Sequence, residues 1–129
     1  MRFINVDLDI LSGHPLDQLC RDLVERGMLL LHVGPHDDGF FARLETELCG
    51  YTSGPEEIIC RFCDVLESLE GKAALEWESS RLRTFDLGYE TTGSPPHSSS
   101  SLSHATLSRI VALGATIAFT FYHRSESES

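Results

Sequence analysis

Two stretches of the chain alternate apolar and polar residues, which is the pattern of a strand buried on one side and solvated on the other. They are residues 3–10 and residues 42–48. If the two strands pair, their polar positions share one face of the sheet. The acidic residues at these positions are Asp7, Asp9, Glu45 and Glu47. The pattern therefore predicts an acidic surface on a rigid sheet.

Apolar residues at helical spacing predict three helices. Pro15 suits a first helical position, an apolar stripe follows on one face, and Gly27 ends the segment. Residues 53–56 have the spacing of a capping box and precede a second stripe, which extends to residue 69, with one or two further turns over residues 72–78. Ser103 caps the third helix, and Gly114 closes it.

The remaining apolar segments predict further strands. Residues 28–33 are almost wholly apolar, as in a strand that is well covered within a sheet. The turn-like composition of residues 34–39 makes this strand and the next one a hairpin. Two further strands are predicted: residues 81–90, and residues 115–123, which are rich in β-branched and aromatic side chains.

The predicted order is β-α-β-β-α-β-α-β, an α+β fold. Its first six elements match a two-layer, ferredoxin-like βαββαβ arrangement, to which an αβ unit is added. We expect the helices on one face of a mainly antiparallel sheet, with the first and third strands as central neighbours. A single domain over residues 1–124 and a disordered acidic tail over residues 125–129 complete the expected organisation.

Charge narrows the choice of partner. The chain of 129 residues has 20 acidic and 10 basic residues, a net charge of −10. The negative electrostatic field of such a chain disfavours binding to nucleic acid and to anionic membranes, and it favours binding to a basic protein or a cation. The start of the chain has no signal-peptide pattern, and four irregularly spaced cysteines do not form a secreted disulfide framework. We therefore expect a reduced, cytoplasmic protein.

The acidic face has two interpretations of similar weight. Like charges on paired strands cost roughly 0.2–1 kcal/mol per close pair, so a sequence that keeps them can be using them to bind a basic partner or a cation. The alternative is an ordinary solvated face of an acidic protein, and Arg43 and Arg83 would partly neutralise it if they share that face. The predicted rim of a partner-binding surface consists of Asp37, Asp38, Tyr89 and Glu90.

Other reactive residue types have plainer explanations. Cys60 and Cys63 lie inside an amphipathic helix, and Cys20 holds an equivalent position on the first helix, so they fit small buried residues better than a zinc or redox site. His32, His36 and the adjacent aspartates bracket a turn of ordinary composition. The serine-rich loop over residues 91–101, with His97 and His104 nearby, has no nucleophile elbow. We expect no catalytic residue, no metal and no cofactor.

The C-terminal third resembles a known group of domains. Residues 103–107, then Ala112-Leu113-Gly114-Ala115, then the strand over residues 117–122 that ends in Tyr122, resemble the closing "helix, Leu-Gly, hydrophobic strand" unit of small uncharacterised bacterial α+β domains. Some members of that group look like immunity proteins of polymorphic toxin systems. The resemblance implies a bacterial binding protein and brings no functional residues with it.

These observations predict a small acidic protein-binding module that is not an enzyme. Its sharpest form is a bacterial immunity-type inhibitor that masks a basic toxin or effector. An alternative is a small-ligand-binding or enzymatic module that uses the cleft between the sheet and residues 91–101. A third option, compatible with either, is a homodimer formed edge to edge through an unpaired outer strand.

Overall fold

The computed structural model describes residues 1–48, 50–91 and 99–123. The predicted acidic tail and most of the serine-rich loop, including His97, lie outside these residues. The elements, in chain order, are β1 (Arg2–Ser12), α1 (Asp17–Glu25), β2 (Leu29–His36), β3 (Gly39–Glu45), α2 (Pro55–Glu67), α3 (Gly71–Ser79), β4 (Leu82–Thr91), α4 (His104–Ala112) and β5 (Thr116–His123).

The five strands form one sheet in the order β2-β3-β1-β4-β5. Only β4 and β5 pair in parallel, because α4 crosses back between them, and the other three pairs are antiparallel. The predicted pairing of β1 with β3 is confirmed, with Asp9 opposite Arg43. The α+β class and the mainly antiparallel sheet are confirmed as well. The ferredoxin-like arrangement stays a prediction.

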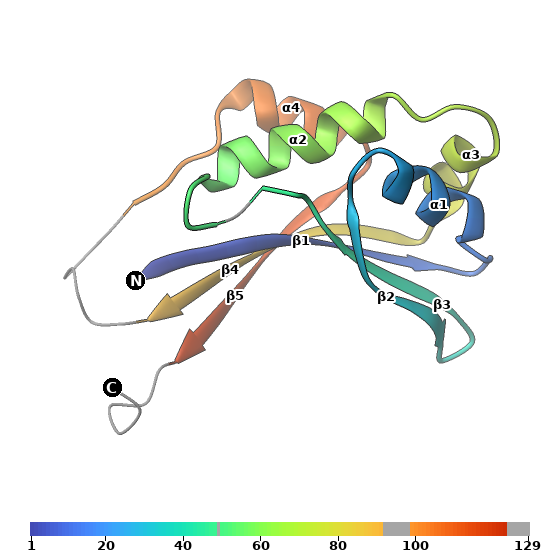
Figure 1. Ribbon diagram of the computed structural model, residues 1–129, viewed down its shortest axis with the longest axis horizontal. Helices are drawn as coiled ribbons and strands as arrows, with labels where there is room; N and C mark the ends of the chain where they lie inside the picture. Colours follow the sequence, from blue (N-terminus) through green and yellow to red (C-terminus); the bar gives the residue numbers. More distant parts are fainter. Residues whose placement is uncertain (49, 92–98, 124–129) are drawn as a thin grey trace.

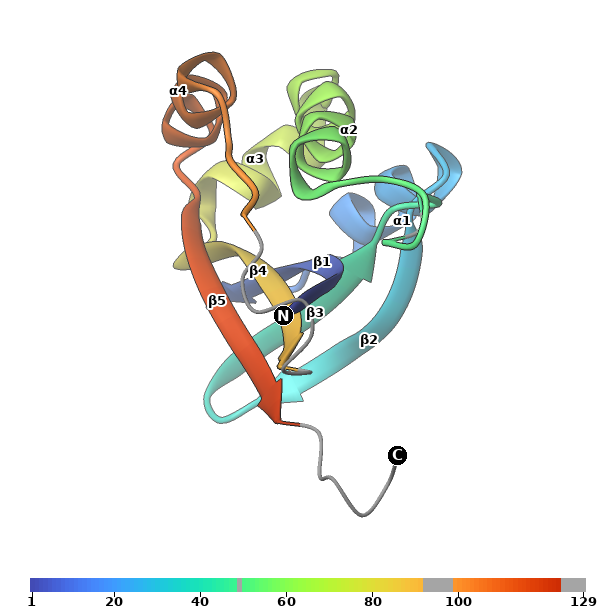
Figure 2. The same ribbon diagram turned by 90° about the vertical axis from the view of Figure 1, so that its left-hand side faces the viewer.

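All four helices lie on one side of the strongly twisted sheet, and the other side is left open (Figures 1 and 2). Alternate residues of β1 point towards the helices, and Val6, Leu8 and Ile10 are completely buried there. The long helix α2 packs its apolar face over them, and the ring of Phe62 lies 5.5 Å from that of Phe85 on β4. Because the helices cover one face only, the polar residues of the same strands stand on the open face.

The strand β2 differs from expectation. The apolar residues at its start predicted a well-covered strand, but β2 is an edge strand that pairs only with β3. Leu29, Leu31 and Val33 are each about half exposed. The prediction was wrong because an apolar run reports hydrophobicity and does not report how many neighbours a strand has.

The segment after α2 is better defined than the sequence indicated. Gly71 adopts a positive φ of 58° and begins the nine-residue helix α3. Its Trp77 is buried, and the indole N–H donates to the carbonyl of Leu113, which ties α3 to the end of α4. Within the described residues, no helix combines the length and apolar character needed to cross a bilayer.

Candidate functional site: the open face of the sheet

Asp7 lies at the centre of the open face. Its neighbours Val6 and Leu8 point into the core, so the strand alternation turns the Asp7 side chain to the open side. In the register of β1 with β4, Asp7 stands opposite Asp86. On β3, Glu45 follows Leu44, the residue opposite Leu8, and so flanks Asp7 from the other strand. We call Glu45, Asp7 and Asp86 the carboxylate row.

Burial and repulsion act together on Asp7. Partial burial, together with repulsion from the nearby carboxylates of Glu45, Asp9 and Asp86, raises the pKa of its carboxyl to about 6. Arg43 acts in the opposite direction and favours the charged form of Asp7. At neutral pH the ionised form of Asp7 therefore destabilises the folded protein.

The neighbours of Asp7 have partners of their own. Arg43 donates two hydrogen bonds to the carboxylate of Asp9, at 2.7 and 3.1 Å. The amide of Asn5 donates to Glu45, and the hydroxyl of Thr120 on β5 lies 2.8 Å from one carboxylate oxygen of Asp86. Within the part of the chain that the structure describes, the carboxylate of Asp7 has no hydrogen-bond donor or ion-pair partner. Asp7 is thus the uncompensated charge of the row.

Glu47 does not belong to this face, and its prediction was wrong. The strand β3 ends at Glu45, and the hydroxyl of the buried Thr46 then accepts a hydrogen bond from the amide of Leu48. This local turn breaks the alternation. The carboxylate of Glu47 is directed to the helix layer, where it accepts from the guanidinium of Arg61 on α2.

The predicted rim is spread along the whole length of β1. Asp37 and Asp38 occupy the β2–β3 turn, next to the end of β1, and both side chains are largely exposed. Glu90 lies at the other end, where it forms an ion pair with Arg2 at the start of β1. The aspartates of the turn and Glu90 therefore do not form one cluster, and only the central carboxylates are close neighbours.

Tyr89 is also placed differently from the prediction. It follows the same alternation as the buried Phe85 and Leu87, so its ring points to the helix side of the sheet. There it packs edge-on against Phe3, at 5.6 Å between ring centroids, and stacks with Phe121 at 5.8 Å. Tyr89 is therefore not at the rim of the acidic face.

The two arginines considered earlier have different roles. Arg43 shares the open face and neutralises Asp9. Arg83 lies on the helix side, where its guanidinium donates to the carbonyls of Trp77, Glu78 and Gly114. Only one of the two arginines therefore offsets the negative charge of the open face.

Two of the three cysteines that were predicted to be buried, Cys20 and Cys63, are buried, whereas Cys60 is only partly buried. Burial raises the pKa of each of the two buried thiols to about 11, so both stay protonated at neutral pH. Cys60 lies 3.3 Å from the hydroxyl of Thr106 on α4. Among the described residues, no three His, Cys, Asp or Glu side chains are arranged to hold a metal ion.

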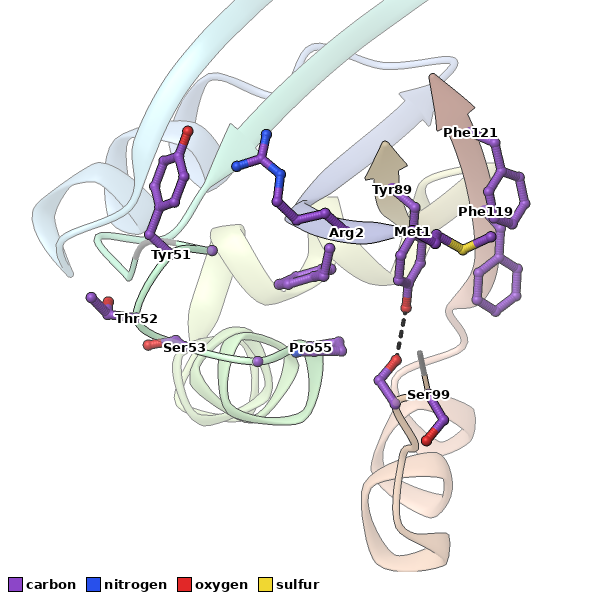
Figure 3. Close-up of a pocket in the computed structure, with 14 residues that line it drawn as sticks. Met1, Arg2, Tyr51, Thr52, Ser53, Pro55, Tyr89, Ser99, Phe119 and Phe121 are labelled. Carbon is purple, nitrogen blue, oxygen red and sulfur yellow. Dashed lines mark hydrogen bonds between the residues drawn. The ribbon is translucent and has the colours of Figure 1, made fainter. Parts of the chain in front are cut away.

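A pocket of about 780 Å³ lies on the helix side of the sheet, near the start of β1 (Figure 3). Tyr89, Phe119 and Phe121 form one wall, and the segment that leads into α2 forms the other. Sequence reasoning named the cleft near residues 91–101 but not these β5 aromatics. It also missed Asp86, since only the register of β1 with β4 places that residue beside Asp7.

Comparisons with known proteins give no assignment. The chain matches no protein-family model, no curated protein and no solved structure. The resemblance of the C-terminal third to small bacterial domains stays a prediction, and function is argued below from geometry alone.

Proposed function

We propose that this protein is a small protein-binding module that recognises a basic partner through the open face of its sheet. The observation that carries the proposal is the uncompensated carboxylate of Asp7, flanked on both neighbouring strands by Glu45 and Asp86. A lysine or arginine of a partner would supply the missing counter-charge and relieve the repulsion within the row. Complementary charge of this kind accelerates association and excludes wrong partners.

The more specific form of the proposal is a bacterial, cytoplasmic immunity-type inhibitor of a basic toxin or effector, built on a ferredoxin-like unit with an added αβ unit. Small size, a net charge of −10 and a rigid open sheet support it. Such an inhibitor acts by covering its target, so it needs a surface and no catalytic group. Co-expression with candidate toxins tests this form: we expect protection by wild-type protein, and absence of both protection and complex formation would contradict it.

A titration tests the general form. The probe is an arginine-rich peptide, added to wild-type protein, to Asp7→Asn/Glu45→Gln and to the matched control Glu25→Gln/Glu78→Gln, which removes the same charge from exposed helix positions. We expect the first variant to bind about tenfold more weakly and the control to bind within about twofold of wild type. Equal weakening in both variants would indicate non-specific attraction and would contradict the proposal.

A second candidate function is small-molecule binding. The pocket shown in Figure 3 is the observation that favours it, because its size lies within the ~300–1,000 Å³ range of ligand sites. Tyr89 and Ser100 line the pocket, and their hydroxyl oxygens lie 3.0 Å apart. The pocket and the carboxylate row use opposite sides of the sheet, so the two functions do not compete for the same residues.

A further inference from the structure

Tyr122 is an exposed aromatic residue on the open face of the sheet. Thr120, two residues earlier on β5, donates to Asp86 on that face, so the alternation of the strand places Tyr122 on the same side. Tyr122 is 55% exposed. Phe121 points to the opposite side, where its ring stacks with that of Tyr89. The face that carries the carboxylate row therefore also carries an aromatic ring that is open to solvent.

The ring of Tyr122 lies against β4 beside the carboxylate row. A Cβ added at Gly88 would be 3.5 Å from Cε2 of this ring, so glycine leaves the space into which the ring extends. Gly88 follows Asp86 by two residues on the same face of β4, and Asp86 stands opposite Asp7. Ile4 of β1 borders the same point, with its Cβ 4.0 Å from the added atom. The aromatic ring and the carboxylate row therefore adjoin each other on the open face.

The same face already holds one arginine by a ring and a carboxylate together. Arg43 donates two hydrogen bonds to Asp9, and its guanidinium lies 5.3 Å from the centre of the Phe41 ring. Phe41 precedes the buried Ala42 on β3, so its ring is on the open side. A guanidinium suits this combination because its plane stacks on a ring while its edge donates to a carboxylate.

Arg2 forms a second arrangement of this kind at the start of β1. It donates to Glu90, two residues beyond Gly88 on β4, and its guanidinium lies 5.3 Å from the centre of the Tyr51 ring. Tyr122 and the carboxylate row make a third combination of ring and carboxylate. Within the residues that the structure describes, no arginine or lysine lies over the Tyr122 ring. The third combination therefore has both components and lacks the cation.

We infer that the open face binds an arginine side chain of its partner, with the guanidinium stacked on Tyr122 and hydrogen-bonded to Asp86 and Asp7. The inference rests on the proposed function and makes it more specific, because it names arginine in place of lysine as the residue that is recognised. An ammonium group lacks both the planar face that stacks on a ring and the parallel donors that engage two oxygens. Arg2 and Arg43 are each paired with another carboxylate.

Three short peptides of glycine and serine test the inference. They differ only in carrying arginine, lysine or citrulline, which has the planar shape of arginine without its charge. Binding is followed by chemical-shift changes in the ring of Tyr122 and in the backbone amides of Asp7 and Asp86. We expect the arginine peptide to bind about fivefold more tightly than the lysine peptide, and the citrulline peptide to bind most weakly.

Variants at Tyr122 separate the ring from the carboxylates. Tyr122→Ala should weaken binding of the arginine peptide about fivefold and remove its advantage over the lysine peptide, because the stacking surface is lost. Tyr122→Leu serves if the alanine variant does not fold, and Tyr122→Phe should keep the preference. Phe119→Ala is the matched control, since Phe119 is an exposed aromatic residue of the same strand whose ring stacks with Tyr89 on the other side of the sheet. It should leave both affinities within about twofold of wild type.

Each contrary outcome has a definite meaning. Equal binding of the arginine and lysine peptides, lost in Asp7→Asn/Glu45→Gln, would overturn the choice of arginine and leave the proposed function standing. A preference for arginine that persists in Tyr122→Ala would overturn the role of the ring. Tighter binding of the arginine peptide by Arg124→Gln would identify that residue of the chain as the occupant and would overturn the inference. No shift at the carboxylate row with any peptide would overturn both the inference and the proposed function.

Discussion

Asp7 is the residue at which stability and proposed function oppose each other. Its carboxylate is partly buried between Glu45 and Asp86, and burial raises its pKa to about 6. In the unfolded chain an ordinary Asp titrates near ~3.9. A raised pKa means that the folded state loses stability as pH rises through the interval between the two values. The proposed basic partner would supply the counter-charge that Asp7 lacks in the isolated protein.

Replacing Asp7 by Asn should stabilise the isolated protein at pH 7. A rise of the Asp7 pKa to about 6 corresponds to roughly 2.7 kcal/mol, and solvent screening of this partly exposed group reduces the expected gain to about 1 kcal/mol. Urea denaturation at pH 7 measures it. Below about pH 3 the wild-type carboxyl is protonated in both the folded and the unfolded state, so the gain should disappear there. A variant less stable than wild type at pH 7 would show that Asp7 has a stabilising partner.

Arg83 shows how one side chain joins three elements. It is the second residue of β4, its guanidinium donates to the last turn of α3 and to Gly114 before β5, and the guanidinium lies 5.4 Å from the centre of the Trp77 ring. Arg83→Met keeps the apolar stem but removes these donors. We expect a loss of about 1–2 kcal/mol in the free energy of unfolding.

Trp77 reports on the same change, because it is the only tryptophan of the chain. Its fluorescence should shift to longer wavelength in Arg83→Met as the end of α3 loosens. The conservative Arg83→Lys should recover part of the loss in stability. If Arg83→Met unfolds at the same urea concentration as wild type, the hydrogen bonds from Arg83 to the three carbonyls do not stabilise the fold, and the prediction is wrong.

At the scale of elements, the edge strand β2 exposes a run of apolar side chains to solvent. Leu31 is 50% exposed beside a register shift, and the strand lacks the charged residues that commonly protect an edge. Leu31→Lys should leave the free energy of unfolding within about 0.5 kcal/mol of wild type. If the expected edge-to-edge homodimer forms, the variant should abolish it in sedimentation-velocity runs over a concentration series. Wild-type protein that sediments as a monomer at all concentrations would show that the homodimer prediction is wrong.

Elements with strong local signals were predictable from the sequence. Gly114 has a positive φ and follows the end of α4, as expected, because this preference is a local property. The expected starts of the first two helices were off by one or two residues: α1 begins at Asp17 and not at Pro15, and the capping positions of α2 are held by Gly54 and Glu57 and not by residues 53 and 56.

The alternation of apolar and polar residues in β1 correctly predicted which of its side chains are buried and which face the open side of the sheet. The end of β3 was not predictable, since Glu47 continues the alternation in the sequence while the hydroxyl of Thr46 turns the chain.

At the scale of the whole molecule, the pairing of strands that are distant in the sequence determines which side chains become neighbours, and local patterns do not predict that pairing. Asp86 lies more than 70 positions from Asp7, and only the β1–β4 register makes them neighbours. Arg83 was assigned to an unspecified face for the same reason. The aromatic pocket depends on how far α4 extends over β5, which no local pattern encodes. The carboxylate row could be anticipated in part, and the pocket could not.

The central claim is that the carboxylate row binds a basic protein, and a matched pull-down from native lysate tests it most directly. The baits are wild-type protein, Asp7→Lys/Glu45→Lys and the control Glu25→Lys/Glu78→Lys, which reverses two exposed acidic residues of α1 and α3. Each bait is washed at low and at moderate salt. We predict a basic protein that wild type and the control retain, that salt releases, and that the Asp7 variant does not bind. Equal retention by all three baits, or no retained basic protein, would contradict the claim.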